Sequence, residues 1–173
     1  MWKIWIGLEI VLIFLTISKV SGYNCNEPTG NDCSWYKDCL ENTNPCGTQG
    51  YALNYALSYC NKYEKNLNKF SSEGQKWIAS VKKCLQVKLA SLLKSKANEK
   101  LSCAFIKQFA FDSHLPCYVD PTGSGTYSFC SLSIKDKYEV VQTIKGAFLS
   151  EFVASVKGGR DLMNKCWFNI KQI

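Results

Sequence analysis

Ten cysteines in a chain of 173 residues constrain its fold more than any other feature. An even cysteine count is typical of secreted proteins in which every thiol is oxidised, so these ten predict five disulfide bonds and an oxidising compartment. No Cys-x-x-Cys pair occurs, which argues against zinc knuckles and thioredoxin-like redox chemistry. Spacing alone does not select the pairing. The predicted structural cysteines are Cys25, Cys33, Cys39, Cys46, Cys60, Cys84, Cys103, Cys117, Cys130 and Cys166.

Residues 1–22 have the pattern of a secretory signal peptide. A lysine precedes an apolar stretch, 4–17, that Glu9 interrupts, and small residues allow cleavage after Gly22. The alternative is an anchor that stays in the bilayer, but this stretch falls short of the roughly 20 apolar residues that a membrane span needs. We therefore expect a secreted, extracellular domain at 23–173, with no stable membrane insertion.

Apolar side chains after residue 50 recur at steps of three and four, which is the spacing of amphipathic helices. Sustained alternation with a period of two, which would indicate strands, does not occur in the sequence. The sequence therefore predicts an all-α fold, a small disulfide-bridged helical domain of four or five helices. Beyond a single turn at 34–39, helices are expected at about 51–67, 72–93, 98–114, 133–157 and 160–168.

Local signals predict where these helices begin and end. Ser72 and Gln75 stand at capping-box spacing, and Asn98 is expected to cap the next helix. That helix is expected to end before Pro116, because proline disfavours helical backbone at the residue before it. Gly158-Gly159 is expected to stop the helix that begins near residue 133. The core face expected for that helix is Tyr138, Val141, Ile144, Phe148, Leu149, Phe152 and Val156.

A stripe of tyrosines marks the first long helix. Tyr51, Tyr55, Tyr59 and Tyr63 recur at four-residue steps and so share one helix face. Such a stripe either packs its rings in the core with the hydroxyls at the rim, or forms a binding face. Packing is the more common outcome, and we expect it here.

The only histidine, His114, follows Asp112 and Ser113, which invites a hydrolase interpretation. Members of a catalytic triad must converge with the base between nucleophile and acid, and adjacent residues rarely do so. A position near a helix C-terminus, where a cation is favoured, is sufficient reason for the histidine. We expect no enzyme, although a small secreted hydrolase using these residues is the alternative.

Metal and cofactor sites are not expected. Cys103, His114 and Cys117 could suggest zinc, but disulfide bonding would claim both cysteines. The loop 120–126 offers Asp120 and several hydroxyl oxygens but lacks the closing glutamate of a calcium loop. We interpret it as a turn-rich connection.

Recognition of another macromolecule is the remaining interpretation. The basic residues include a single arginine, Arg160, so bidentate readout of nucleic acid is poorly provided for, and no nucleic acid is expected. Trp35 and Trp77 would be binding anchors if exposed, but are more often core residues. Lysines on the second and third helices form either a solvated exterior or a basic face for acidic glycans or an acidic receptor: Lys82, Lys83, Lys88, Lys94, Lys96, Lys100 and Lys107.

Short motifs around the cysteines form an ordered set: Cys39-Leu40-Glu41-Asn42 before Cys46; Phe70, Gly74-x-x-Trp77 and Lys83 between Cys60 and Cys84; Cys103 with Phe109; Cys117-Tyr118; and Cys130 with Cys166. In these motifs and the order of its cysteines the chain resembles the stanniocalcin family of secreted helical signalling glycoproteins. The resemblance covers residues 25–166.

This resemblance implies a non-enzymatic, hormone-like factor in calcium and phosphate homeostasis that binds a receptor or an extracellular protease. A secreted effector or toxin on the same scaffold is the alternative. Vertebrate members continue into a tail whose extra cysteine joins two subunits, so a covalent dimer is not expected for a chain that ends at Ile173. No Asn-x-Ser/Thr sequon occurs, so N-glycosylation is not expected. The disulfide pairing that the resemblance implies is Cys25–Cys39, Cys33–Cys60, Cys46–Cys103, Cys84–Cys117 and Cys130–Cys166.

Overall fold

Helices make up the regular secondary structure of the described residues, which are 24–146 and 152–168 of a computed structural model. The predicted all-α class is confirmed, whereas the predicted signal peptide at 1–22 lies outside the described residues. Short π- or 3₁₀-helical segments are labelled η. The elements are η1 (Tyr36–Glu41), η2 (Tyr51–Leu57), α1 (Ser58–Asn66), η3 (Leu67–Lys69), α2 (Ser72–Ser95), α3 (Cys103–Val119), η4 (Phe129–Ser131), α4 (Ile134–Ile144) and α6 (Phe152–Phe168).

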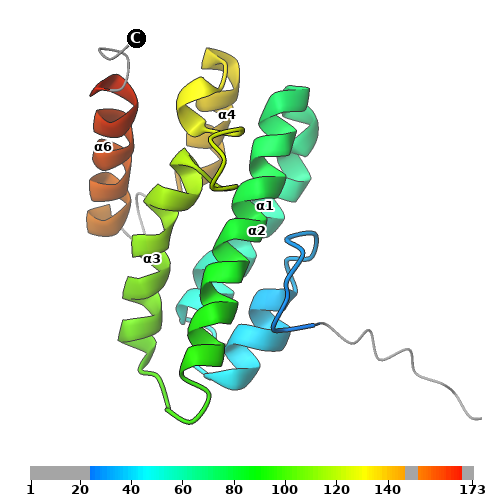
Figure 1. The fold of residues 1–173 in the computed structure, drawn as a ribbon, viewed down its shortest axis with the longest axis vertical. Helices are drawn as coiled ribbons and strands as arrows, with labels where there is room; N and C mark the ends of the chain where they lie inside the picture. Colours follow the sequence, from blue (N-terminus) through cyan, green and yellow to red (C-terminus); the bar gives the residue numbers. More distant parts are fainter. Residues whose placement is uncertain (1–23, 147–151, 169–173) are drawn as a thin grey trace, which may run out of the picture.

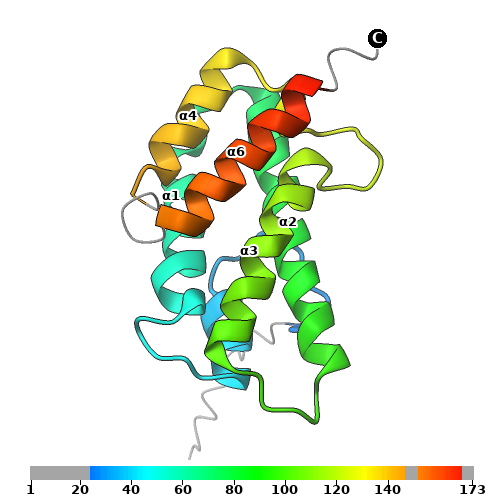
Figure 2. The same cartoon turned by 90° about the vertical axis from the view of Figure 1, so that its left-hand side faces the viewer.

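The longest helix, α2, forms an antiparallel pair with α3, and a short loop joins them at one end of the molecule (Figure 1). At the other end α6 packs on α3, and α4 packs on α1 (Figure 2). The N-terminal segment is tied to α2, because the Gln86 side chain donates a 2.8 Å hydrogen bond to the Asp32 carbonyl. None of the helices described has the length and apolar content of a membrane span.

Serine hydroxyls cap α2, α3 and α4 at their N-termini. Ser71, Ser102 and Ser133 each accept a hydrogen bond from the backbone N–H three residues later, at 3.2, 3.2 and 3.0 Å. Each bond satisfies one of the N–H groups that a helix start leaves unpaired. The capping box predicted at Ser72 and Gln75 is wrong by one residue, since Gln75 instead donates to a carbonyl just before the helix.

Both expected ends of α3 are wrong. The helix begins at Cys103 rather than after Asn98, and it passes through Pro116 to end at Val119. Proline removes one helical hydrogen bond, yet the final turn persists because Cys117 is fully buried and bonded to Cys84 on α2. A tertiary crosslink therefore outweighs the local signal.

The long helix expected from residue 133 to a stop at Gly158-Gly159 is also wrong. The chain forms α4, which ends at Ile144, and α6, which runs through both glycines. The expected helix at 160–168 is the second half of α6. Two glycines inside a helix cost about 2 kcal/mol relative to alanine. The buried Leu162 and the Cys130–Cys166 bond hold this helix in place against that cost.

The helix α4 turns the opposite face to the core from the one expected. Asp136, Val140 and Thr143 are buried, whereas Tyr138 and Val141, both expected in the core, are exposed. Both faces carry apolar residues, so periodicity finds the stripes without deciding which one is inside. Of the other expected core residues, Ile144 is half-buried, and the side chains of Phe148, Leu149, Phe152 and Val156 lie outside the described part of the chain.

Buried apolar side chains form two clusters, and α2 contributes to both. The lower cluster, near the α2–α3 loop, lies between η1, η2, the C-terminal half of α2 and the start of α3. The upper cluster lies between α1, the first half of α2, the end of α3, η4, α4 and α6. The α2 members are Leu89 and Ala90 below, and Trp77, Ile78, Val81 and Leu85 above.

All ten cysteines lie in the described residues and none is free. The bridges are Cys25–Cys39, Cys33–Cys60, Cys46–Cys103, Cys84–Cys117 and Cys130–Cys166, with Cα–Cα distances of 5.5, 5.7, 5.6, 5.7 and 5.0 Å. Three of them border the lower cluster and two the upper cluster. These are the same five pairs that the stanniocalcin resemblance implies.

A single carboxylate joins the starts of α2 and α4. Asp136 is 0 % exposed and accepts hydrogen bonds from the Ser71 amide at 2.8 Å, the Ser71 hydroxyl at 2.6 Å and the Ser133 hydroxyl at 2.8 Å. Burial acts to raise the pKa of Asp136, but the bonds from Ser71 and Ser133 outweigh it and the pKa is lowered. The carboxylate therefore stays charged at neutral pH, and its hydrogen bonds fix which face of α4 turns toward the core.

Gly74 on α2 is predicted to tolerate no side chain. A Cβ built there would lie 2.7 Å from the Asp136 carboxylate oxygen, whereas one at Gly159 on α6 meets nothing within 4 Å. We expect Gly74→Ala to lower the free energy of unfolding by about 1–3 kcal/mol through overpacking, and the matched Gly159→Ala to raise it by about 0.5–1 kcal/mol. Urea denaturation with the disulfides intact measures both. Equal stabilisation by the two substitutions would contradict the placement of Asp136.

Candidate functional site

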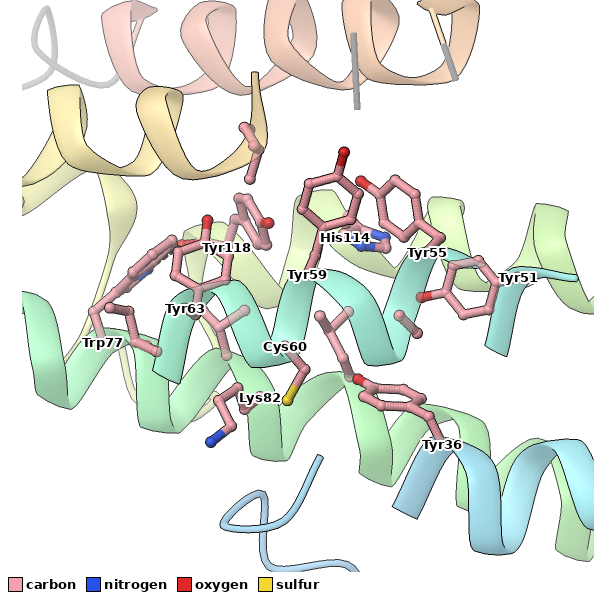
Figure 3. A pocket seen from close by; sticks show the side chains of 15 residues that line it. Tyr36, Tyr51, Tyr55, Tyr59, Cys60, Tyr63, Trp77, Lys82, His114 and Tyr118 are labelled. Atoms are coloured by element: carbon pink, nitrogen blue, oxygen red, sulfur yellow. Dashed lines mark hydrogen bonds between the residues drawn. The ribbon is translucent and has the colours of Figure 1, made fainter. Parts of the chain in front are cut away.

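The tyrosine stripe lines a cavity between η2, α1, α2 and α3 (Figure 3). Its volume is about 40 Å³, which is room for a few water molecules and too little for a drug-sized ligand. The predicted packing of the rings is confirmed, because Tyr51, Tyr59 and Tyr63 are buried and Tyr55 is half-buried, but the Tyr63 hydroxyl lies in the interior instead of at the rim. The lining also includes Tyr36, Trp77, Ile78, Val81, Lys82, His114, Tyr118 and Ile144.

Ring contacts connect the stripe to α3. The Tyr55 ring lies 4.7 Å from Tyr59, 4.8 Å from Phe111 and 5.9 Å from His114, measured between ring centroids. His114 in turn stacks on Phe111 at 5.4 Å. Edge-to-face and tilted pairs of this kind add to the stability that burial of the rings supplies. The stripe is therefore part of the core that holds α1 to α3.

The phenol groups of the cavity are held in their neutral form. Burial raises the pKa of Tyr36, Tyr51, Tyr63 and Tyr118, so each can act as a hydrogen-bond donor at physiological pH. The Tyr63 hydroxyl is buried and has no hydrogen-bond partner of normal geometry, although Tyr118 lies close enough to influence its pKa. A buried unpaired hydroxyl is destabilising.

One lysine of the expected basic face lies at this cavity instead. Lys82 is buried and forms an ion pair with Glu64 on α1. The pair is partly solvated, since 44 % of the Glu64 side chain is exposed. A lysine of α2 that spacing placed on the surface therefore ties α2 to α1.

Two of the remaining predicted lysines are paired or partly covered. Lys96 pairs with Glu99 at 2.9 Å, and Lys107 is half-buried. Both candidate anchors are core residues, because Trp35 and Trp77 are 2 % and 1 % exposed. The lysines of the expected face that are exposed are Lys83, Lys88, Lys94 and Lys100.

The structure does not bring Asp112, Ser113 and His114 together as a triad. Each bonds to the preceding turn of α3: Asp112 accepts from the Gln108 amide, Ser113 donates to the Phe109 carbonyl, and His114 Nδ1 lies 2.8 Å from the Ala110 carbonyl. A carbonyl only accepts, so Nδ1 carries the hydrogen. Burial lowers the pKa of His114, with the bond to Ala110 opposing it. The explanation of His114 as a cation at a helix C-terminus is therefore wrong.

The two candidate metal sites are engaged in other bonds. Cys103 and Cys117 form disulfides with different partners, so they present no thiolate beside His114. In the loop 120–126, an Asp120 oxygen accepts a 2.9 Å bond from the Gly125 amide, and the hydroxyls bond to one another. Across the described residues, no three His, Cys, Asp or Glu side chains converge on a point that could hold a metal ion.

Sequence spacing found the tyrosine stripe but missed three partners of its cavity. Tyr36, His114 and Tyr118 come from η1 and α3, far along the chain from the stripe. No local pattern brings them to it. The pairing Cys84–Cys117 that the stanniocalcin resemblance implies fixes the end of α3 against α2, and so bears on the placement of His114 and Tyr118.

Comparison with known proteins returned no match: no family model, no curated protein and no solved structure is similar to this chain.

Removing the Tyr63 hydroxyl, which has no hydrogen-bond partner of normal geometry among the described protein groups, should not weaken the fold. We expect Tyr63→Phe to raise the free energy of unfolding by about 1 kcal/mol, because the buried donor no longer loses its bond to water on folding. Tyr138→Phe on exposed α4 is the matched control and should change it by less than about 0.5 kcal/mol. Thermal and urea unfolding measure both. A loss of more than 1 kcal/mol in Tyr63→Phe would show that the hydroxyl is bonded.

His114, the only histidine, is expected to make the free energy of unfolding depend on pH in the acid range. Because the folded-state pKa of His114 lies below its ordinary value of 6.5, the unfolded chain takes up a proton first as the pH falls. Stability should be unaffected above pH 7 and decrease below about 6.5, by at most about 1.4 kcal/mol per pH unit. His114→Phe keeps an aromatic ring and should abolish this decrease between pH 7 and 5, measured by urea unfolding. An equal slope in the variant would refute the assignment.

Proposed function

We propose that this chain is a secreted, non-enzymatic signalling protein of the stanniocalcin type, which acts by binding a receptor or an extracellular protease in calcium and phosphate homeostasis. The observation that carries the proposal is the bridge pattern. Ten cysteines allow roughly 900 pairings, and the five pairs in the structure coincide with the five that the resemblance implies.

The arrangement of the bridges suits an extracellular ligand. Three crosslinks tie the polar N-terminal segment to η1, α1 and α3, and one ties α2 to α3. Each removes conformational freedom from the unfolded chain and stabilises by a few kcal/mol. A surface held in this way loses little entropy when it binds a partner.

The polar groups that the sequence offered for catalysis are bonded to the backbone of α3, which favours a binding function over a hydrolase. Ser113 is buried and donates to a backbone oxygen, and His114 donates its Nδ1 hydrogen to another. A hydrolase using them would need the serine to face the histidine. Contact through the exterior of a rigid helical domain is the function that these observations favour.

The protein recovered from the medium of cells that express the full chain tests the proposal. Mass spectrometry should find the five pairs of the structure and no free thiol. Applied to an epithelial monolayer, the protein should change the flux of radiolabelled calcium or phosphate. His114→Ala, a control that removes the imidazole, should act like the wild type.

Four results would each count against the proposal. Retention of the chain in cells would remove the extracellular role, and free thiols would remove the rigid frame. Unchanged ion flux with a correctly bridged protein would remove the mineral-balance role. Loss of an effect in folded His114→Ala would favour the hydrolase instead.

A further inference from the structure

The outer face of α4 is an apolar ridge. Ile134 is 87 % exposed, Tyr138 59 % and Val141 47 %, and they stand at positions i, i+4 and i+7. Residues at this spacing lie in one line, here about 10 Å long. Ile134 is the most exposed large apolar side chain that the structure describes. We call these three residues the α4 ridge.

The exposure of the ridge is fixed by the fold. Asp136 lies on the opposite face of α4 with Val140 and Thr143, and it is bonded to Ser71 at the start of α2. Rotating α4 to bury the ridge would break these bonds and leave the Ser71 amide and hydroxyl without their acceptor. The apolar face therefore stays outside although it could have served as core.

The borders of the ridge are basic. Lys135 and Lys145 are exposed at its two ends, and Lys137 stands beside Tyr138 with its ammonium bonded to the Cys130 carbonyl. Of the two acids on α4, Asp136 is buried and Glu139 is half-buried. The chain as a whole carries a formal net charge of +7. A partner with acidic borders therefore complements this surface.

We propose that the α4 ridge docks against an amphipathic helix of a partner protein whose apolar stripe is bordered by acidic side chains. The proposal rests on the proposed binding function and names its contact surface. A ridge with i, i+4, i+7 spacing packs into the groove of another helix. A second copy of this chain is a poorer occupant, because it would bring Lys135 and Lys145 of both copies to one interface.

The test uses the secreted, fully bridged protein and a pair of synthetic amphipathic helices with the same leucine stripe. One peptide has glutamates along both borders of the stripe, and the other has lysines there. We expect the glutamate peptide to bind at least tenfold more tightly at low salt, with the difference shrinking as salt rises. An NMR titration of the labelled protein should place the shifted amides on α4.

Substitutions separate the ridge from exposed apolar residues in general. The triple variant Ile134→Ser, Tyr138→Ser, Val141→Ser should lose at least tenfold in affinity for the glutamate peptide, and Lys135→Glu with Lys145→Glu should lose several-fold. The matched control is Val87→Ser with Phe105→Ser on α2 and α3, where the side chains are 40 % and 46 % exposed. It should bind like the wild type.

Several outcomes would overturn the proposal. If the two peptides bind equally, acidic borders are not what the surface recognises. If the control on α2 and α3 loses as much affinity as the triple variant, the ridge is not the binding site. Tighter binding to anionic vesicles than to the glutamate peptide assigns the ridge to a membrane surface, and dimerisation abolished by the triple variant assigns it to a second copy. If the peptide binds only to a chain truncated after Phe168, residues 169–173 are the segment that competes for the α4 ridge.

The ion-flux assay keeps this proposal separate from the proposed function. If the wild type alters flux and the folded triple variant does so equally, the ridge is not the contact surface and the signalling role stands. If the wild type has no effect on flux, the mineral-balance role fails whatever the peptides show.

Discussion

The helix α2 is the element on which the rest of the structure depends. Its first half buries Trp77 and Val81 in the upper cluster, and its second half buries Leu89 in the lower one. Without α2, both clusters would lose these side chains, each of which contributes about 1.5–3 kcal/mol on burial. The Lys82–Glu64 ion pair and the Cys84–Cys117 bridge fix α1 and α3 to its sides. The positions of α1 and α3 follow from these attachments, and α4 is held to the start of α2 by Asp136.

The helix positions could be predicted from the sequence because burial of one face imposes a period of 3.6 on apolar residues. The ends were less predictable, because a proline or a glycine pair is only a local preference. At Pro116 and at Gly158-Gly159 the chain stays helical, with Cys117 and Cys166 bonded just beyond. Crosslinks between distant residues decided these cases, and single-sequence periodicity carries no information about them.

The face of α4 could not be predicted for a different reason. Tyr138 and Val141 form as good an apolar stripe as Val140 and Ile144, so hydrophobicity ranks both alike. A polar contact decides which face of α4 is buried. Asp136 accepts hydrogen bonds from the capping serines of α2 and α4, so it must face them. The tyrosine cavity is a similar case, since the stripe is visible in the sequence while its partners from η1 and α3 are not.

The apolar ridge and the bridged frame have a common physical basis. An exposed apolar stripe costs free energy in water and favours collapse onto the core, so it persists only where the helix cannot rotate. On α4 the Asp136 contacts prevent rotation, and lysines at the ends of the ridge oppose contact between copies. The cost of the exposed stripe would be recovered on binding, because a rigid ridge is already in the conformation that a partner helix requires.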